Sequence, residues 1–161
     1  AFARGDSLEE TVPVDPFALA AGVAEDARRT GASVELLRVD ENGGDAVPLR
    51  PLAVGRALQN LVANAARHAR SLVQVAVLPA GRWVRLVVDD DGPGIPPEDR
   101  LRVFDRFTRL SPDAAPESGG AGLGLALVAA LVQGRGGTVS AGESHSGGAR
   151  LDVRWPASHD A

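Results

Sequence analysis

Apolar residues recur at helical spacing in some stretches of the chain and at every second position in others. The helical pattern predicts three long helices, over residues 16–29, 51–69 and 122–133. Asp15 and Pro16 suit the N-cap and the first turn of the earliest helix, and Gly31 suits its end. Residues 97–103 predict one further, short helix.

Alternating stretches predict six strands, at residues 11–14, 33–39, 71–78, 82–89, 138–143 and 149–155. Pro13 would confine the first strand to a sheet edge, because proline cannot donate to a ladder. Pro79-Ala80-Gly81 predicts the turn of a hairpin, and residues 40–45 predict another turn. Residues 108–121 predict a loop of the length at which loops often act as lids. The order of elements predicts one sheet with all long helices on one face.

A chain of 161 residues with 44% hydrophobic content is long enough for one domain with its own core. We expect residues 1–13 to be a linker remnant or edge segment, residues 14–156 the domain and residues 157–161 a tail. The net charge of −4 argues against non-specific nucleic-acid binding and gives no basic stripe for a membrane surface. No stretch reaches the ~20 apolar residues of a membrane span, and the start lacks a signal-peptide layout. These features predict a soluble domain, which we expect to be a piece of a larger protein.

Two residue types that the chain lacks exclude several kinds of site. There are no cysteines, so disulfides and thiolate metal sites are excluded. All 17 basic residues are arginine. A Walker-A loop, a Ser/Thr/Tyr protein kinase and a PLP enzyme each need a lysine, so a nucleotide would have to be bound by another route.

Two asparagines four residues apart, Asn60 and Asn64, lie inside the alanine-rich second helix. This spacing places both amides on one helix face. Asparagine is a mediocre helix former, so two of them in mid-helix need a reason. One reason is a ligand, since an amide oxygen can hold Mg²⁺ without adding charge. The other is a pair of buried amides that bond to neighbouring backbone.

Two glycine motifs follow later in the chain. Asp90-x-Gly92-x-Gly94 lies at a strand end, where glycines let backbone approach a flat ligand and a carboxylate can accept from an exocyclic amine. An ordinary acidic turn is the alternative. Gly120-x-Gly122-Leu123-Gly124-Leu125 opens a helix whose free N–H groups can receive phosphate oxygens, although a flexible hinge would have the same composition. No strand runs directly into these glycines, which argues against a Rossmann motif.

In this order, the Asn box at 60–68, the Asp90-x-Gly92-x-Gly94 box, the Phe box at 104–107 and the glycine box at 120–125 resemble one family. The chain is similar to the ATP-binding catalytic domain of bacterial two-component sensor histidine kinases, of the GHKL ATPase superfamily. The resemblance covers about residues 14–156. It implies an α/β (α+β) two-layer sandwich of the Bergerat type, with about three long helices on one face of a mixed, mostly antiparallel sheet.

The resemblance also implies how ATP and Mg²⁺ would be bound. Asn64 would coordinate Mg²⁺, Asn60 would support the metal and the phosphates, and Arg67 would reach the phosphates. Asp90 would bind the adenine amine. The other residues that the resemblance places around the nucleotide are His68, Gly92, Gly94, Ile95, Phe104, Arg106, Phe107, Arg109, Gly120, Gly122, Leu123, Gly124, Leu125 and Thr138.

Some of these roles are more specific. Phe104 and Phe107 would anchor the lid, and Arg106 or Arg109 would contact the γ-phosphate. His68 stands where the family often has an aromatic residue along the adenosine, but a histidine at a helix end is equally explained as a surface or C-cap residue. The hydroxyl residue that follows the family's last glycine pair would correspond to Thr138.

ATP-hydrolysing relatives such as gyrase and chaperone-type ATPases resemble this pattern but have a glutamate where Asn60 stands, as a general base for water. An amide cannot act as that base. The resemblance therefore implies that the γ-phosphoryl group goes to a histidine on a separate dimerisation domain, which is absent from this chain. It also implies a downstream response regulator, a monomeric fragment of a homodimeric parent, and a cytoplasmic domain whose parent is anchored in the inner or plasma membrane.

Three alternatives remain beside this interpretation. Anti-sigma-factor serine kinases share the superfamily, but the Phe box and Asn60 argue against them. A nucleotide-binding module that has lost transfer would keep the same boxes. An α/β domain with glycine-rich turns and no nucleotide would not need all four boxes in order.

Overall fold

The computed structural model describes residues 9–38, 46–105 and 121–157. Three α-helices lie in this part of the chain: α2 (Pro16–Arg29), α3 (Pro51–His68) and α4 (Ala121–Gln133). A short 3₁₀ helix, η1, covers Pro97–Asp99. None of the helices in these ranges is long and apolar enough to cross a membrane.

Five strands form the main sheet in the order β2-β4-β5-β7-β6. They are β2 (Val34–Arg38), β4 (Val73–Ala80), β5 (Trp83–Asp90), β6 (Thr138–Glu143) and β7 (Ala149–Pro156). The edge strand β2 runs parallel to β4, whereas the other neighbouring pairs are antiparallel. A separate two-stranded ribbon pairs β1 (Val12–Val14) with β3 (Val47–Leu49).

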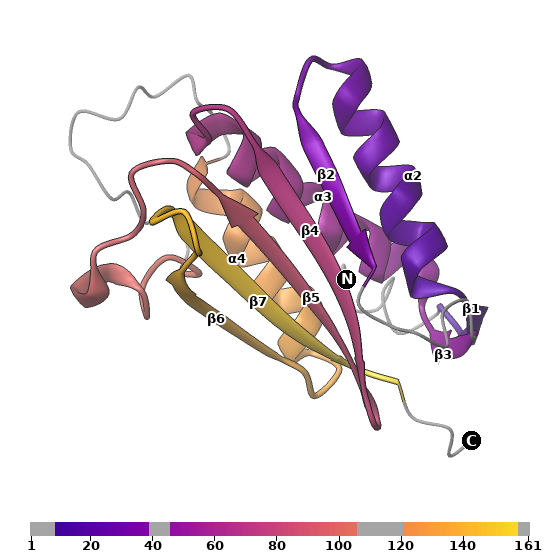
Figure 1. Ribbon diagram of the computed structural model, residues 1–161. Coiled ribbons are helices and arrows are strands. Elements are labelled where there is room, and N and C mark those ends of the chain that lie inside the picture. Colours follow the sequence, from indigo (N-terminus) through magenta and orange to yellow (C-terminus); the bar gives the residue numbers. More distant parts are fainter. Residues whose placement is uncertain (1–8, 39–45, 106–120, 158–161) are drawn as a thin grey trace.

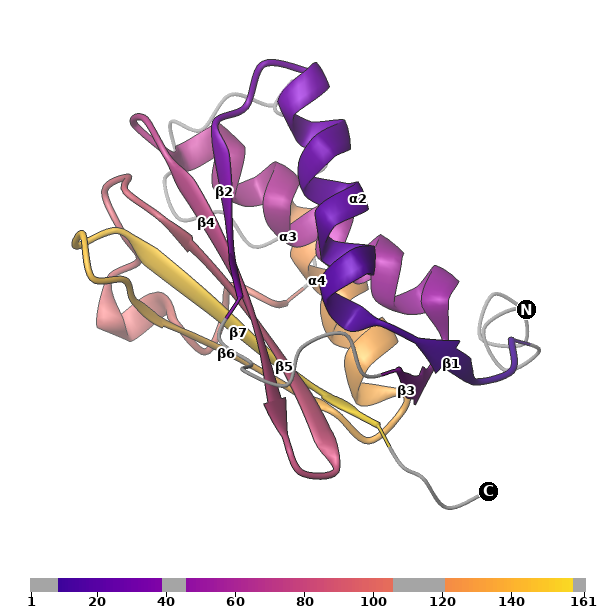
Figure 2. The same ribbon diagram turned by 45° about the vertical axis from the view of Figure 1, so that its right-hand side comes forward.

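The three helices cover one face of the sheet, with α3 between α2 and α4 (Figures 1 and 2). Alternation along each strand explains this layer, because every second residue points toward the helices. Leu86 on β5 and Val153 on β7 are neighbours in register and are both fully buried. Helix α3 contributes Leu58 and Leu61 to the same core. The expected two-layer α/β sandwich, with a mixed and mostly antiparallel sheet, is confirmed.

The two longest helices begin in different ways. Asp15 caps α2 locally, since its Oδ1 accepts the backbone N–H of Phe17 at 3.0 Å. The residue before α3, Arg50, makes no side-chain cap. Instead, Glu9 reaches across from the N-terminal segment, and its two carboxylate oxygens accept the N–H groups of Leu52 at 2.7 Å and Ala53 at 3.1 Å. A distant residue therefore satisfies the first turn of the helix that carries both asparagines.

The structure corrects several sequence predictions. Strand β3 was not predicted. The hairpin turn between β4 and β5 is shorter than predicted, because Pro79 and Ala80 remain in the strand and Ala80 pairs with Trp83. The helix predicted over residues 97–103 is one 3₁₀ turn at Pro97–Asp99, followed by further turns. The predicted turn at 40–45, and the predicted loop up to residue 120, lie outside the described residues.

Residues on both sides of the domain limits expected from sequence take part in the fold. Strand β1 spans the expected boundary between residues 13 and 14. At the other end, Ala157 is buried and donates its N–H to the carbonyl of Arg82 at 2.7 Å. Residues just outside the expected limits therefore pack against the domain.

Candidate functional site

Asp90 is the last residue of β5, and only 3% of its surface is exposed. Its Oδ1 accepts the N–H of Gly92 at 2.8 Å and the N–H of Ala149 at 3.2 Å. Its main-chain carbonyl accepts the hydroxyls of Ser144 at 2.8 Å and Ser146 at 3.2 Å. In the described part of the chain no hydrogen bond reaches Oδ2. The carboxylate is thus fixed through one oxygen, and the other remains able to accept from a ligand.

Two close backbone approaches surround Asp90. A Cβ on Gly92 would lie 2.1 Å from the carbonyl oxygen of His68, at the end of α3. A Cβ on Gly148 would lie 2.2 Å from the carbonyl oxygen of Asp90 and 2.6 Å from its Oδ1. Only glycine fits at these positions without displacing the neighbouring backbone. The glycines therefore bring the end of α3 and the β6–β7 turn against the strand end that carries Asp90.

Asp91 ties the same strand end to the connection between α3 and β4. Its Oδ1 accepts the backbone N–H groups of Arg70 at 2.8 Å, Ser71 at 3.0 Å and Leu72 at 3.2 Å. The Ser71 hydroxyl donates to Oδ2. These bonds, with the Ser71 hydroxyl first among them, hold the pKa of the Asp91 carboxyl well below its usual range. The carboxylate is therefore ionised at neutral pH, and it holds the connection between α3 and β4 against the end of β5.

The two α3 asparagines have different surroundings. Asn64 is 8% exposed, and its Oδ1 has a long contact of 3.5 Å to a guanidinium nitrogen of Arg67. Asn60 is partly exposed and donates its Nδ2 to the carbonyl of Arg56 at 2.8 Å. A Cβ on Gly124 would lie 3.3 Å from Asn60 Oδ1. The Asn60 amide oxygen therefore faces the first turns of α4.

His68 ends α3 beside this set of residues. The residue as a whole is exposed, but its imidazole is partly desolvated by neighbouring atoms. This desolvation, together with repulsion by the Arg67 guanidinium, lowers the pKa of the His68 imidazole, and the Asp90 carboxylate opposes the change in part. A neutral imidazole is therefore the form present at neutral pH.

The structure brings most of the sequence-predicted residues to one region, formed by α3, the start of α4 and the end of β5. Ile95 and Leu125 are buried in the adjacent core, and Phe104 packs partly buried against it. Gly122 and Leu123 lie in the first turn of α4. Four predicted residues lie outside the described part of the chain: Arg106, Phe107, Arg109 and Gly120.

Thr138 is not brought to this region. It begins β6 and pairs with Arg154, whereas β7 meets Asp90 at its opposite end, at Ala149. The glycine pair that precedes the residue beside Asp90 is Gly147-Gly148, and the residue after it is alanine. No side-chain hydroxyl is available at position 149, so the contact to Asp90 Oδ1 comes from a backbone N–H.

Sequence reasoning missed the two serines and Asp91. Ser144 and Ser146 lie in a Gly/Ser turn that is about 55 residues from Asp90 in sequence, and nothing local in that turn predicts their partner. The second glycine pair was the available signal, because it predicts a close backbone approach at the start of β7. Asp91 was visible as part of the Asp-Asp-Asp run but had no assigned role.

The arrangement fits a divalent ion bound mainly by a ligand's own oxygens. In residues 9–38, 46–105 and 121–157 there is no cluster of three or more His, Cys, Asp or Glu side chains that could hold a metal. The Asn64 amide oxygen is a hard, uncharged donor with one long contact to protein. Mg²⁺ often takes only one or two protein ligands, with phosphate oxygens and water completing the octahedron. The donor set therefore suits Mg²⁺ that arrives with a polyphosphate.

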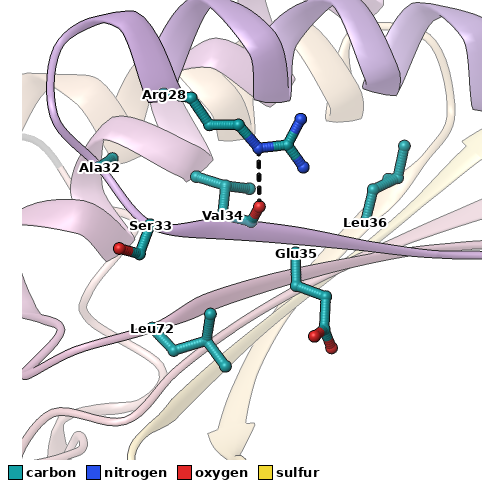
Figure 3. A pocket seen from close by; sticks show the side chains of 7 residues that line it. All are labelled: Arg28, Ala32, Ser33, Val34, Glu35, Leu36 and Leu72. Carbon is teal, nitrogen blue, oxygen red and sulfur yellow. Dashed lines mark hydrogen bonds between the residues drawn. The ribbon is translucent and has the colours of Figure 1, made fainter.

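A surface hollow lies elsewhere, along the edge strand β2 (Figure 3). Arg28 from the end of α2 crosses it and donates Nε to the carbonyl of Val34 at 2.9 Å. Ser33, Glu35 and Leu72 also line it. None of the site residues predicted from the sequence lines this hollow. The Arg28 contact occupies an otherwise open edge carbonyl, which is a common protection against pairing with another strand.

Comparisons with known proteins agree on one family. The family model described as "Histidine kinase-, DNA gyrase B-, and HSP90-like ATPase" matches residues 50–159. The chain is 45% identical over 105 residues to the sensor protein RstB of Escherichia coli K12, which covers 65% of this chain and 24% of RstB. The chain thus spans about a quarter of that relative.

Two solved structures are similar in fold over almost the whole chain. The ATP binding domain of PrrB from Mycobacterium tuberculosis has a TM-score of 0.72 at 34% identity, covering 92% of this chain and 98% of that one. Full-length ShkA in complex with AMPPNP has a TM-score of 0.76 at 28% identity, covering 91% of this chain and 31% of that one.

Proposed function

Because the chain belongs to the histidine kinase-, DNA gyrase B-, and HSP90-like ATPase family, we propose that it binds ATP with Mg²⁺ and transfers the γ-phosphoryl group to a histidine in two-component signalling. The observation that supports this most is the buried Asp90 carboxylate, held through Oδ1 and the carbonyl. Its Oδ2 would accept a hydrogen bond from the exocyclic amine of adenine. The sensor kinase relatives and the AMPPNP complex of ShkA support the same ligand.

In this proposal the nucleotide extends from the end of β5 to the middle of α3. Adenine lies against Asp90, Gly92 and Gly94, with the neutral His68 imidazole near the adenosine. The phosphates lie between α3 and the start of α4, where the N–H groups of the first turn are free of helical partners and can receive anionic oxygens. Gly124, which faces Asn60, leaves room for this approach.

Mg²⁺ would be held by the Asn64 Oδ1 and by phosphate oxygens, with Asn60 beside them. The ion would supply charge neutralisation to the phosphates during transfer. Arg67, whose guanidinium lies 3.5 Å from Asn64 Oδ1, would turn toward the phosphates. These groups position and stabilise charge, which is most of what phosphoryl transfer requires of a protein.

An amide at position 60 has no proton-accepting role toward water, so hydrolysis would be slow in this domain. The acceptor would be a histidine on a dimerisation domain of the same parent kinase, and the phosphoryl group would pass from it to a response regulator. The parent would be a homodimer anchored in the membrane, with this domain in the cytoplasm. The loop expected over residues 108–121 would act as a lid on the nucleotide, with Arg106 or Arg109 at the γ-phosphate, Phe107 as a lid anchor and Gly120 at the phosphates.

A transfer assay tests the proposal. The chain is incubated with γ-labelled ATP, Mg²⁺ and a separately purified dimerisation domain of its parent kinase, with the acceptor histidine replaced in a control. We expect acid-labile label on the acceptor domain, none on the control, and little free phosphate when the acceptor is left out. Rapid phosphate release without the acceptor, or no nucleotide binding at all, would contradict the proposal.

A further inference from the structure

The β5–β7 ladder changes character at the end that carries Asp90. Its last backbone rung pairs Asp89 with Arg150. Beyond that rung the Ala149 N–H bonds to the Asp90 side chain at 3.2 Å, and the Asp90 carbonyl accepts two serine hydroxyls. At Asp90, therefore, a backbone N–H bonds to the side chain, and side-chain hydroxyls bond to the backbone carbonyl.

The turn that supplies these hydroxyls is itself closed. The Ser144 N–H donates to the carbonyl of Gly148 at 2.9 Å, and the Gly147 N–H donates to the carbonyl of Ser144 at 3.0 Å. Ser144 is 5% exposed, and its Oγ lies 3.1 Å from that of Ser146. The closed turn and the contact to Ser146 fix the position of the Ser144 hydroxyl. Its hydrogen bond to the Asp90 carbonyl therefore restricts rotation of the Asp90 peptide group.

We propose that Ser144, supported by Ser146, is a positioning residue that sets the base specificity of the site by fixing the direction of Asp90 Oδ2. The inference rests on the proposed function, since it assumes that Asp90 accepts the adenine amine. Two sets of hydrogen bonds, here called anchors, hold Asp90. Oδ1 accepts from the backbone N–H groups of Gly92 and Ala149, and the carbonyl accepts from the two serine hydroxyls. With both anchors in place, Oδ2 has one direction.

Loss of the Ser144 hydroxyl weakens the carbonyl anchor, which keeps only the longer bond from Ser146, and leaves both N–H bonds to Oδ1 in place. The peptide group that follows Asp90 can then rotate more freely, which displaces the Gly92 N–H that holds Oδ1 and so changes the direction of the carboxylate relative to the base. A hydrogen bond depends steeply on angle, so a base that bonds to Oδ2 loses affinity. A base that makes no such bond loses none. Specificity, rather than general affinity, is therefore the property that the hydroxyl controls.

ATP and inosine triphosphate provide the probe, because inosine has a carbonyl oxygen where adenine has the amine and therefore has no hydrogen-bond donor at that position. Dissociation constants for both nucleotides are measured by calorimetry on wild type, Ser144→Ala and Ser144→Ala/Ser146→Ala. Ser140→Ala, an exposed serine on β6, is the matched control. Thermal unfolding of each variant shows that it is folded.

We expect the preference for ATP over inosine triphosphate to fall about fivefold to tenfold in Ser144→Ala, the equivalent of one hydrogen bond, and further in the double variant. Ser140→Ala keeps the wild-type preference. An unchanged preference in folded Ser144→Ala, or an equal loss for both nucleotides, overturns the inference while the proposed function stands. A wild type without preference for ATP overturns the role of Asp90 and the inference with it; Ser144→Ala alone decides if the double variant does not fold.

Discussion

The two ends of the candidate nucleotide site are built differently. At the end of β5, the Asp90 carboxylate and carbonyl accept four hydrogen bonds from two backbone N–H groups and two hydroxyls. On α3, the amide oxygen of Asn64 has only a 3.5 Å contact to Arg67, and the Asn60 side chain bonds back to its own helix. At Asp90 the protein satisfies every acceptor oxygen except Oδ2, whereas on α3 the two amide oxygens accept little from protein in the described part of the chain.

This difference indicates a division of labour. Groups that are already bonded cost little to hold in place when a ligand arrives, so the Asp90 end is suited to selecting a base. Weakly bonded amide oxygens are suited to a partner that brings charge, such as a metal ion on phosphates. In the proposed function, recognition of the base and binding of the metal therefore belong to different groups, and separate substitutions should disrupt each.

The largest effect is expected at the base end, from Gly148→Ala. Its Cβ would lie 2.2 Å from the Asp90 carbonyl oxygen, so the strand end must move. We expect ATP affinity to fall at least about 100-fold, and the free energy of unfolding to fall by about 1–3 kcal/mol, as in overpacked cores. Calorimetry and urea unfolding measure both quantities.

Gly142→Ala is the control for this change, because a Cβ there meets nothing within 4 Å. It should leave ATP affinity unchanged. Wild-type affinity in Gly148→Ala would show that the close approach to Asp90 is not needed for binding.

At the metal end, Asn64→Ala should act only when Mg²⁺ is present. We expect ATP to bind about 10- to 100-fold more weakly in Mg²⁺, and with unchanged affinity in EDTA, because only the metal loses a ligand. Calorimetric titrations in the two buffers give the comparison. Gln59→Ala removes an exposed amide from the same helix and serves as the control. An equal loss in both buffers would place Asn64 in a structural role.

A smaller effect is expected where the N-terminal segment caps α3. Glu9→Ala leaves the N–H groups of Leu52 and Ala53 without the carboxylate, and we expect the free energy of unfolding to fall by about 0.5–2 kcal/mol, as for other lost caps. Glu10→Ala, at an exposed neighbouring residue, should change it little. A preference between ATP and inosine triphosphate that shifted in Glu9→Ala would contradict the separation of the two ends.

The smallest effect is a pH dependence from Asp91. Its folded pKa lies below the unfolded value of 3.8, so the stabilisation is present above that value and is lost as the pH falls through the folded pKa. We expect wild-type stability to decline below about pH 5 and the decline in Asp91→Asn to be shallower by up to one proton. Urea unfolding between pH 7 and pH 2.5 measures the slopes. Identical slopes would show that these hydrogen bonds do not lower the pKa of Asp91 in solution.

Local patterns in the sequence predicted the fold well. Helical spacing predicted α2 and α3, and alternation predicted β6 with the bounds that the structure has. Strand β3 was missed because Val47-Pro48-Leu49 is short and contains a proline, and it forms a strand only by pairing with β1. The family resemblance, carried by boxes that are local in sequence, was confirmed by the family match.

The sequence predicted only those residues of the candidate site that lie in local sequence motifs. Asn60, Asn64 and Asp90 lie in motifs that are local in sequence, and the order of these motifs along the chain indicated the family. Ser144 acts on Asp90 from another strand connection, and Thr138 was chosen because an earlier glycine pair precedes it. Strand register decides which glycine pair meets Asp90, and register is a property of the folded sheet. The assigned ligand roles themselves stay predictions.

The most direct test of the central claim, that Asp90 selects adenine, is a calorimetric titration of ATP into wild type and Asp90→Asn. Asparagine keeps an oxygen for the N–H groups of Gly92 and Ala149 but has an amide NH₂ group in place of Oδ2, so the fold should be retained while the adenine amine meets a donor. We predict that wild type binds ATP and that Asp90→Asn binds it at least about 100-fold more weakly with unchanged thermal unfolding. Equal ATP affinity in the two proteins would contradict the account.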